Sequence, residues 1–410
     1  MKKREFFLVL PKQASHLTPL RLTRMEISGA LADLGALLPL VLALVALNHV
    51  DVTRVFFLFG LAYLATGIYY RLPIPVQPLK VICIVAIATQ ATPAMISLAA
   101  FMHGLILLAL VATGMIEKLA RIMTRPLVVG IQMTVGLLLS FHAILILVPP
   151  VTAYRLGLPH FGGWNLYPVF HSTNMHLLVG VLAILWLWAL QHNKHVPAAI
   201  AVLAAGLAAG FFLSTTRISA DPGVVLQWWQ SFSWATLVHV GWIMVFPQIL
   251  LSLANTVYAS SDAAHRVHGL AAERVSPRSF ATSIGCFNTV IGLGGGVPVS
   301  HGASGVMSHY VFGARTAAAP VFMGFLFLFF SLGLGRERSL AVLSLLPMPV
   351  LGALLLFAGL AMLSFWKNLQ TGSERAVALT VVGVAVLTQG LPWALLAGIF
   401  LDLILRKQDI

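Results

Sequence analysis

Long apolar stretches alternate with short polar links along almost the whole chain. About 20 apolar residues in a helix cross the hydrocarbon core of a bilayer. We therefore predict membrane-spanning helices at residues 27–48, 53–70, 93–116, 126–148, 175–190, 196–213, 235–258, 279–293, 317–334, 349–366, 376–389 and 392–405. Two shorter apolar runs, which begin at Pro78 and Ser300, predict half-helices. The expected fold is an all-α polytopic membrane protein with about 14 spans.

Two segments interrupt this apolar pattern. The first break is PIPVQPLK (Pro73–Lys80), and the second is the glycine-rich segment Gly294–Arg315, which carries Pro298. Neither segment suits a continuous membrane helix. Non-helical backbone at membrane depth is tolerated only where it is buried in protein or lines a watery cavity. We predict that the two breaks form the walls of one binding site.

A fixed offset relates the two halves of the chain. Adding 222 to the residue number takes Glu26 to Gln248, Asp33 to Asn255, Val76 to Pro298 and Gly130 to Gly352. The offset aligns a polar pair in each half, both breaks, and the starts of two later spans. Because seven spans per half is an odd number, the halves must be inverted in the membrane, as in secondary transporters built from inverted repeats.

Composition supports a membrane location. The chain has 410 residues, of which 59% are hydrophobic and 9% are charged. The formal charge of +13 is scattered between apolar spans, which disfavours a nucleic-acid surface. With a cytoplasmic N-terminus, 19 of the 25 Lys and Arg residues fall inside, Lys80 falls within the membrane, and five fall outside (Arg54, Arg155, Arg217, Arg336 and Arg338). We expect cytoplasmic termini and a plasma or inner membrane location.

Several other site classes are disfavoured. Cys83 and Cys286 lie in apolar stretches and predict no disulfide framework, and no His–Cys spacing predicts a metal site. The segment Gly292–Gly296 lacks the Lys-Ser/Thr ending of a phosphate-binding loop. The basic N-terminus has too short an apolar run before Pro11 for a signal peptide.

The two breaks carry the residue types that bind an anion. Helix N-termini offer free N–H groups and a partial positive charge. Lys80 adds a full positive charge, Ser300 and Ser304 offer hydroxyl groups, and small residues let a ligand approach the backbone. The candidate binding residues are Gln77, Pro78, Lys80, Ser300, His301, Gly302, Ala303 and Ser304.

Ionisable groups inside spans are costly and are commonly functional. Asp33 and Glu26, seven residues apart and so expected on one helix face, are candidates for proton coupling. Each candidate also has a structural alternative: an ion pair for Lys80 and Asp33, and packing or capping for His301. Gln248 and Asn255 either contact the ligand or hydrogen bond between helices.

The motifs EISGALADLG (26–35), PIPVQPLK (73–80) and GGVPVSHGASGVMSHYVFGART (295–316), with the looser FPQILLSLANT (246–256), resemble the molybdate transporter family related to the sulfate permeases. The resemblance implies an oxyanion importer with a core domain and a gate domain. Gln77, Lys80, His301, Gly302 and Asp33 fall in the family's motifs. Ser300 stands where the family usually has Cys, and Ser304 where it usually has Gly, so both changes bear on substrate choice.

We therefore predict a secondary active transporter of a tetrahedral oxyanion, molybdate first and sulfate second, and not an enzyme. The alternatives are a nucleobase or other organic-anion permease on the same fold, and an anion channel. Expected partners are the oxyanion, a coupling proton, the lipid bilayer and, in a homodimer, a second copy, with no cofactor. The expected divisions are a cytoplasmic tail (1–25), the core domain (26–116 and 235–334) and the gate domain (117–234 and 335–410).

Overall fold

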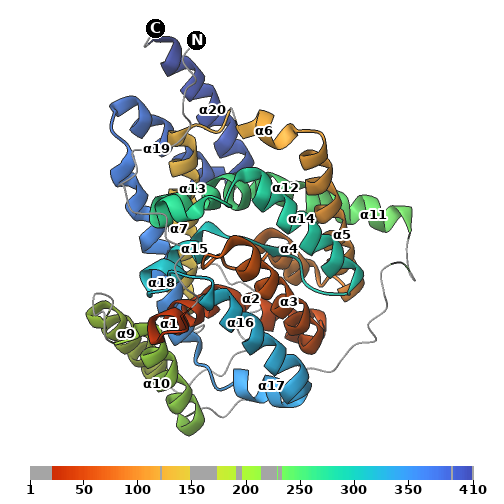
Figure 1. The fold of residues 1–410 in the computed structure, drawn as a ribbon, viewed down its shortest axis with the longest axis vertical. Coiled ribbons are helices and arrows are strands. Elements are labelled where there is room, and N and C mark those ends of the chain that lie inside the picture. Colours follow the sequence, from red (N-terminus) through yellow and green to blue (C-terminus); the bar gives the residue numbers. More distant parts are fainter. Residues whose placement is uncertain are drawn as a thin grey trace.

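The computed structural model describes residues 21–120, 122–147, 173–190, 196–213, 229, 233–388 and 391–408, nearly all of them helical (Figure 1). The first half contains α1 (Arg24–Ala32), α2 (Leu34–Asn48), α3 (Val52–Tyr70), α4 (Lys80–Thr89), α5 (Pro93–Ala112), α6 (Met115–Ala120), α7 (Arg125–Leu147), α9 (Thr173–Leu190) and α10 (Ala198–Leu213). The expectations for residues 1–20, the loop at 149–171, the link at 191–195 and most of the Trp-rich loop at 214–234 lie outside the described residues.

The second half contains more helical segments, because several helices include π or 3-10 turns. They are α11 (Trp234–Val240), η3 (Gly241–Val245), α12 (Phe246–Leu251), η4 (Ser252–Ala259), α13 (Ser260–His268), η5 (Gly269–Ala272), α14 (Pro277–Leu293), α15 (Ala303–Val311), α16 (Ala318–Leu328), η6 (Phe329–Leu334), α17 (Gly335–Leu343), α18 (Met348–Leu363), η7 (Ser364–Asn368), α19 (Gly372–Thr388) and α20 (Leu391–Gln408).

Six of the described helices are long and apolar enough to cross a bilayer, or seven if α1 and α2 form one span. Three shorter apolar helices, Met175–Leu190, Ala198–Phe212 and Trp393–Leu405, accompany them. The polytopic helical character is therefore confirmed, while the count of 14 spans stays a prediction.

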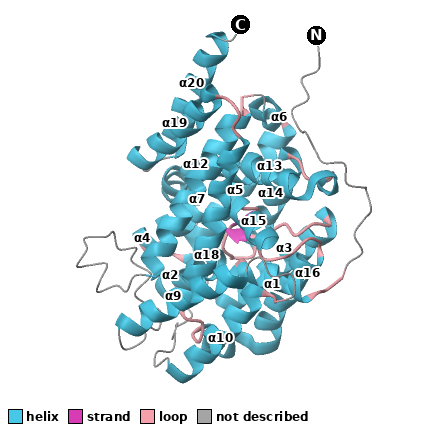
Figure 2. Cartoon of the chain, turned by 90° about the vertical axis from the view of Figure 1, so that its left-hand side faces the viewer, coloured by secondary structure: helices cyan, strands magenta, loops and turns pink. Residues whose placement is uncertain are grey.

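Two short strands lie in the middle of the bundle. Strand β1 (Gln77–Pro78) pairs antiparallel with β2 (Val299–Ser300), with Gln77 opposite Ser300 and Pro78 opposite Val299. The Leu79 N–H also donates to the Pro298 carbonyl at 2.9 Å. Figure 2 shows this pair enclosed by helices. The two breaks therefore meet, and the backbone groups that leave the helices are satisfied by each other, as membrane depth requires.

The half-helices begin later than the sequence predicted. Helix α4 begins at Lys80 and not at Pro78, and α15 begins at Ala303 and not at Ser300. The reason is that Pro78 and Ser300 are held in the strand pair, where an extended backbone is required. A proline fits the edge of such a pair because it has no N–H to donate.

The first span is bent and not continuous. Helices α1 and α2 meet at an angle of 43° at Asp33. Asp33 lies at the bend, as the C-cap of α1 and the N-cap of α2, and the shared face of Glu26 and Asp33 stays a prediction. In the second half, the helix of the eighth span runs from Trp234 to Ala272, so it continues well beyond the end predicted at residue 258.

Three helix pairs make the most extensive contacts in the bundle: α5 with α14, α3 with α16, and α7 with α18. Glycines allow their backbones to approach closely, as small residues do in membrane helices. A Cβ at Gly104 would lie 2.7 Å from the Gly285 carbonyl, and one at Gly60 would lie 3.0 Å from the Gly324 carbonyl. The offset of 222 carries α3 to α14, α5 to α16 and α7 to α18, so it exchanges the first two pairs.

Candidate functional site

A small polar cavity lies where the two breaks meet the helix of the eighth span. It is about 10 Å³, which is the space of roughly one water molecule. The lining residues come from three regions: Gln77, Leu79 and Lys80 from the first break, Ser300 and Gly302 from the second, and Gln248, Leu251, Asn255 and Thr256 from α12 and η4. A tetrahedral oxyanion would need these side chains to move apart.

Lys80 is the only charged residue among those that line this cavity. Its Nζ lies 3.5 Å from the Ser304 Oγ, and the Ser304 hydroxyl donates to Gln77 Oε1 at 3.4 Å. Both contacts are long, so an incoming oxyanion could replace them at little cost. The remaining polar lining consists of carboxamide and hydroxyl groups. These groups can donate hydrogen bonds to the oxygens of an anion, and they carry no negative charge that would repel it.

The two half-helices present their N-termini differently. In α4, the Val81 and Ile82 N–H groups donate to Gln248 Oε1 at 2.9 and 3.4 Å. Gln248 therefore caps this helix, so the prediction of two equally free N-termini is corrected for α4. In α15, the Ala303 and Ser304 N–H groups have no acceptor within the described part of the chain. The second half-helix is thus the one with unpaired backbone donors.

A buried chain of hydrogen bonds connects the α4 cap to the second break. The Gln248 Nε2 donates to Ser252 Oγ at 3.0 Å, and Ser252 Oγ lies 2.8 Å from the Nε2 of His103. The other ring nitrogen of His103 lies 3.1 Å from Asn288 Nδ2. Asn288 in turn accepts from the Val299 N–H at 2.7 Å and donates to the Val299 carbonyl at 2.8 Å. One network therefore holds both breaks.

The His301 ring faces away from the cavity. Its Nδ1 lies 2.8 Å from the Pro75 carbonyl, and its Nε2 lies 2.9 Å from Ser283 Oγ. Tyr70, Phe280 and Phe287 surround the ring. Both ring nitrogens are therefore engaged, which corrects the prediction of His301 as a ligand-contacting side chain. The proline in the first break leaves a carbonyl without a helical partner, and His301 supplies the donor.

The two acidic candidates have different surroundings. Glu26 Oε1 accepts from the Arg315 and Thr316 N–H groups at 2.9 and 3.0 Å, so its carboxylate fastens α1 to the end of the second break. Asp33 is fully buried and accepts from the Tyr63 hydroxyl at 2.9 Å and from Gln77 Nε2. Asp33 is thus linked to the cavity through Gln77, whereas Glu26 has no such link through any described hydrogen bond.

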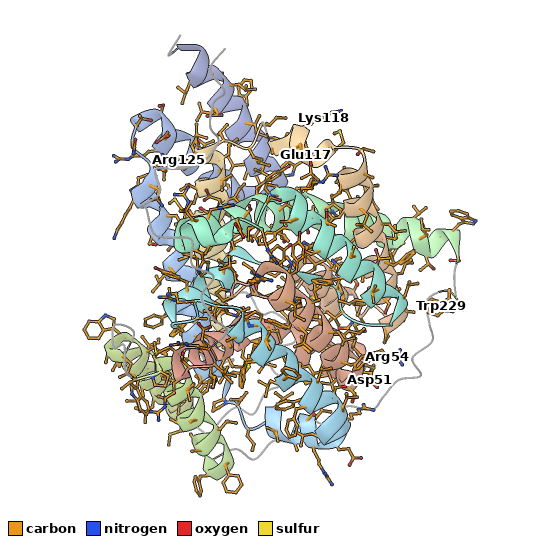
Figure 3. The ribbon with its side chains drawn as sticks, viewed as in Figure 1. Asp51, Arg54, Glu117, Lys118, Arg125 and Trp229 are labelled. Carbon is orange, nitrogen blue, oxygen red and sulfur yellow. The ribbon has the colours of Figure 1, made fainter. Side chains whose placement is uncertain are left out.

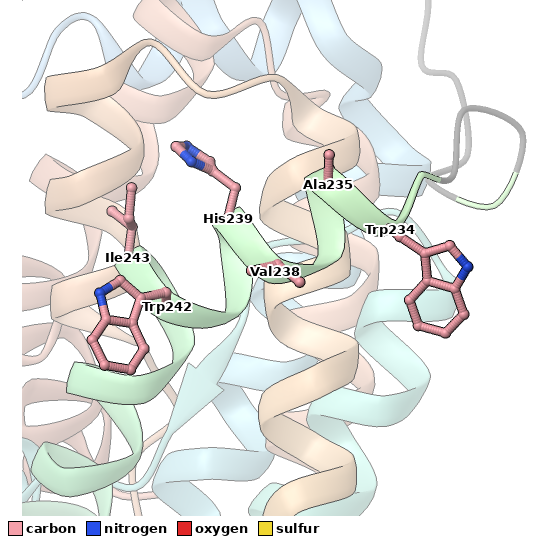
Figure 4. Close-up of a pocket in the computed structure, with 6 residues that line it drawn as sticks. All are labelled: Trp234, Ala235, Val238, His239, Trp242 and Ile243. Carbon is pink, nitrogen blue, oxygen red and sulfur yellow. The ribbon is translucent and has the colours of Figure 1, made fainter.

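A second hollow, on the outer face of α11 and η3, has the wrong chemistry for an anion. Its volume is about 550 Å³, and Figure 4 shows its lining: Trp234, Ala235, Val238, His239, Trp242 and Ile243. Most of these side chains are apolar, and Trp234 and Trp242 are exposed. Such a face suits lipid chains, so the small polar cavity is the better candidate despite its size.

Six of the predicted site residues line the cavity: Gln77, Lys80, Gln248, Asn255, Ser300 and Gly302. Ser304 contacts two of them, while Pro78 and Ala303 contribute through the strand and the start of α15. The sequence analysis missed Thr256, the supporting residues His103, Ser252 and Asn288, and the Asp33 partners Tyr63 and His309. His103 and Asn288 could have been found from the sequence, because each is a polar residue within an apolar span.

Comparisons with known proteins identify related sequences. A family profile described as "Molybdate transporter of MFS superfamily" matches residues 25–139 and 241–362. Molybdate transporter 2 of Arabidopsis thaliana is 26% identical over 432 residues, covering 94% of this chain and 88% of the relative. Molybdate transporter 1 of Chlamydomonas reinhardtii is 25% identical over 477 residues, covering 92% of this chain and 90% of the relative.

Solved structures share the fold at low sequence identity. The transmembrane domain of a cyanobacterium bicarbonate transporter, BicA, superposes with a TM-score of 0.60 at 17% identity, covering 92% of this chain and 97% of that domain. The murine anion transporter Slc26a9 in the inward-facing state superposes with a TM-score of 0.56 at 15% identity, covering 94% of this chain and 68% of that one. The profile match includes both breaks and the helix that faces them, so the chain belongs to the molybdate transporter family.

Proposed function

We propose that the chain is a secondary active transporter of a tetrahedral oxyanion, molybdate first and sulfate second. The observation that carries the proposal is the cavity between the breaks, which combines Lys80 with neutral hydrogen-bonding groups and with the unpaired N-terminus of α15. A dianion is stabilised by a positive charge and by N–H and O–H donors. The names of the relatives in Arabidopsis and Chlamydomonas favour molybdate.

The proposed architecture is a pair of inverted repeats, with a core domain that moves against a gate domain. The symmetric register of the strand pair supports the repeat, because the offset of 222 converts the Gln77–Ser300 pair into the Val299–Pro78 pair. The proposed orientation keeps both termini in the cytoplasm of a plasma or inner membrane. Figure 3 shows Glu117, Lys118 and Arg125 toward one end of the molecule and Asp51 and Arg54 in its other half, as that orientation requires.

A nucleobase permease is the less favoured alternative. Such a site would need a carboxylate in the eighth span to accept ring N–H groups, and this chain offers Gln248 and Asn255 there. An anion channel would need a continuous polar path, whereas the polar groups described here gather around one small cavity.

The test is uptake of labelled molybdate by purified protein in liposomes, with sulfate, tungstate and uracil as competitors. We expect tungstate and sulfate to compete and uracil to have no effect. Lys80→Ala should reduce uptake to background, while the exposed Lys367→Ala should leave it unchanged. Competition by uracil, or normal uptake by Lys80→Ala in a folded protein, would refute the proposal.

A further inference from the structure

The bend between α1 and α2 places a carboxylate in a fully enclosed environment. Asp33 has no exposed surface, and its carboxylate is approached by three side chains from three other elements. Tyr63 in α3 donates its hydroxyl to Oδ2 at 2.9 Å, and Gln77 in β1 donates through Nε2 to Oδ1. His309 in α15 brings its Nε2 to 3.9 Å from Oδ2. An ionised carboxylate in such a place is costly unless it is paired.

When the His309 ring is neutral, neither of the two atoms that face one another across the Asp33–His309 contact carries a hydrogen. His309 Nδ1 lies 2.9 Å from the Pro73 carbonyl, which only accepts, so Nδ1 carries the hydrogen of the neutral ring. The Nε2 is then a lone-pair acceptor, and it has no hydrogen-bond partner among the described residues. Two buried acceptors therefore face one another, Asp33 Oδ2 and His309 Nε2. One proton between them would convert the gap into a charge-assisted hydrogen bond.

Gln77 connects this pair to the cavity. Its Nε2 faces Asp33, while its Oε1 faces Ser304 on the cavity side. The carboxamide is closely confined, because a Cβ at Gly302 would lie 2.2 Å from Oε1 and one at Gly305 would lie 2.6 Å from Nε2. The assignment of nitrogen and oxygen follows from the network, since an ionised carboxylate requires a donor. In this arrangement an acceptor oxygen faces the place where an anion would bind.

We propose that Asp33 and His309 form the binding site of the coupling proton, and that Gln77 links this site to the oxyanion cavity. The inference rests on the proposed transport function. A proton from water binds between Asp33 Oδ2 and His309 Nε2, and the charge of the pair rises from −1 to zero. Proton binding neutralises the carboxylate that Gln77 Nε2 faces, so it weakens the hold of Asp33 on the carboxamide. It also removes a negative charge from beside the oxyanion cavity.

The charge of the Asp33–His309 pair affects binding of a dianion because few other charged groups of the described residues lie nearby. The groups that interact electrostatically with Asp33 or His309 are Tyr63 from α3, Lys80 from α4 and His268 from α13. When Lys80 is charged and the pair is not protonated, a dianion would enter a site with no net positive charge. Proton binding restores the positive charge. Because the linkage is reciprocal, the oxyanion must strengthen proton binding by the same factor, on the order of 5- to 150-fold for typical couplings.

The experiment uses the full chain in liposomes with a trapped pH-sensitive dye and labelled molybdate outside. We expect molybdate entry by the unaltered protein to acidify the lumen, and an acidic exterior to accelerate uptake. Asp33→Asn should abolish both effects. His309→Gln should reduce the acceleration at least about fivefold. His239→Gln, on the exposed α11 helix of Figure 4, is the matched control and should match the unaltered protein.

The outcomes separate the two proposals. If the unaltered protein neither binds nor exchanges molybdate, the transport proposal fails. If it takes up molybdate without acidifying the lumen, the transport proposal stands and the proton site is refuted. Retained acidification in Asp33→Asn, or an acceleration in His309→Gln equal to that of the unaltered protein, would also refute it. If Asp33→Asn does not fold, the dye signal of the unaltered protein and the His309→Gln variant still decide the question.

Discussion

The two breaks pair with each other in the fold but are built from different residues. The first break is rich in proline and supplies the long side chains Gln77 and Lys80. The second is rich in glycine and supplies space and unpaired backbone N–H groups at the start of α15. The carboxamide of Gln77 lies against Gly302 and Gly305, so each break is incomplete without the other. The comparison indicates that the first break contributes mainly side chains to the cavity and the second mainly backbone groups and space.

The proline-rich break also depends on the second break for hydrogen bonds. The Pro73 and Pro75 carbonyls, which have no helical partner, lie within hydrogen-bond distance of the His309 and His301 rings. The strand of the second break is instead held by Asn288 of α14, which hydrogen bonds to both the N–H and the carbonyl of Val299. Buried backbone groups are therefore paired on both sides, although by different means.

Among substitutions that test the different roles of the two breaks, we expect the largest loss of molybdate uptake from Gly302→Ala. The new Cβ would lie 2.2 Å from Gln77 Oε1, so the carboxamide would have to leave its place. A displacement of about 1 Å in a binding site can cost on the order of 100-fold in rate, and we expect a loss of molybdate uptake of this size. Labelled uptake in liposomes measures it.

The matched control is Gly383→Ala in α19, where an added Cβ meets no atom within 4 Å. This variant should transport normally. If Gly302→Ala also transports normally, the absence of a side chain at Gly302 is not needed to accommodate Gln77.

An intermediate effect is expected from Gln248→Glu, which tests whether the capped and uncapped half-helices differ in role. A carboxylate can still accept from the Val81 and Ile82 N–H groups, so the cap on α4 should survive. The new negative charge would lie in the lining of the cavity and repel a dianion by a few kcal/mol at an effective dielectric near 20. We expect the apparent affinity for molybdate to fall at least about tenfold.

Thermal unfolding in detergent provides the control for Gln248→Glu. A melting temperature close to that of the unaltered protein, together with weaker binding, would assign Gln248 to both the cap and the cavity. Unchanged affinity would restrict Gln248 to capping.

The smallest effect is expected from an exposed ion pair at the surface. Arg278 at the start of α14 donates to Glu117 in α6 at 2.6 Å, and both side chains are largely exposed. The hydrogen bond from Arg278 lowers the pKa of Glu117 from its ordinary value of 4.5. The ion pair therefore stabilises the fold above that value, and its contribution is lost as the pH falls through the lowered pKa.

Arg278→Gln should cost less than about 1 kcal/mol, because exposed ion pairs contribute little. The measurement is the difference in melting temperature between neutral pH and pH 4, with and without the substitution. A difference between the two proteins that grows on acidification would contradict the assignment.

The sequence was informative where a residue type has one physical consequence at membrane depth. Proline and glycine in an apolar chain predicted both breaks, and the offset of 222 predicted that they correspond. The positions of Gln77, Lys80, Ser300 and Gly302 in the cavity followed from those breaks. The exact helix starts were missed, because the strand pair is a long-range contact that local periodicity does not encode.

The roles of individual side chains were less predictable. His301 and His309 belong to the same motif, yet one ring is fully engaged and the other faces Asp33. His301 precedes α15 and His309 lies within it, so the local sequence does not show which ring will face Asp33. Likewise, a glutamine that caps a distant half-helix cannot be told from one that contacts a ligand until the fold brings Gln248 to Val81.

The pairing of β1 with β2 has a mechanical consequence. Main-chain hydrogen bonds join the first break to the second, so we expect α4 and α15 to move together. In the proposed transport cycle, a motion that exposes the cavity to either side of the bilayer would therefore carry both half-helices. An oxyanion bound between the half-helices would then move together with its binding site. The access paths to the site would open and close where these helices contact the surrounding ones.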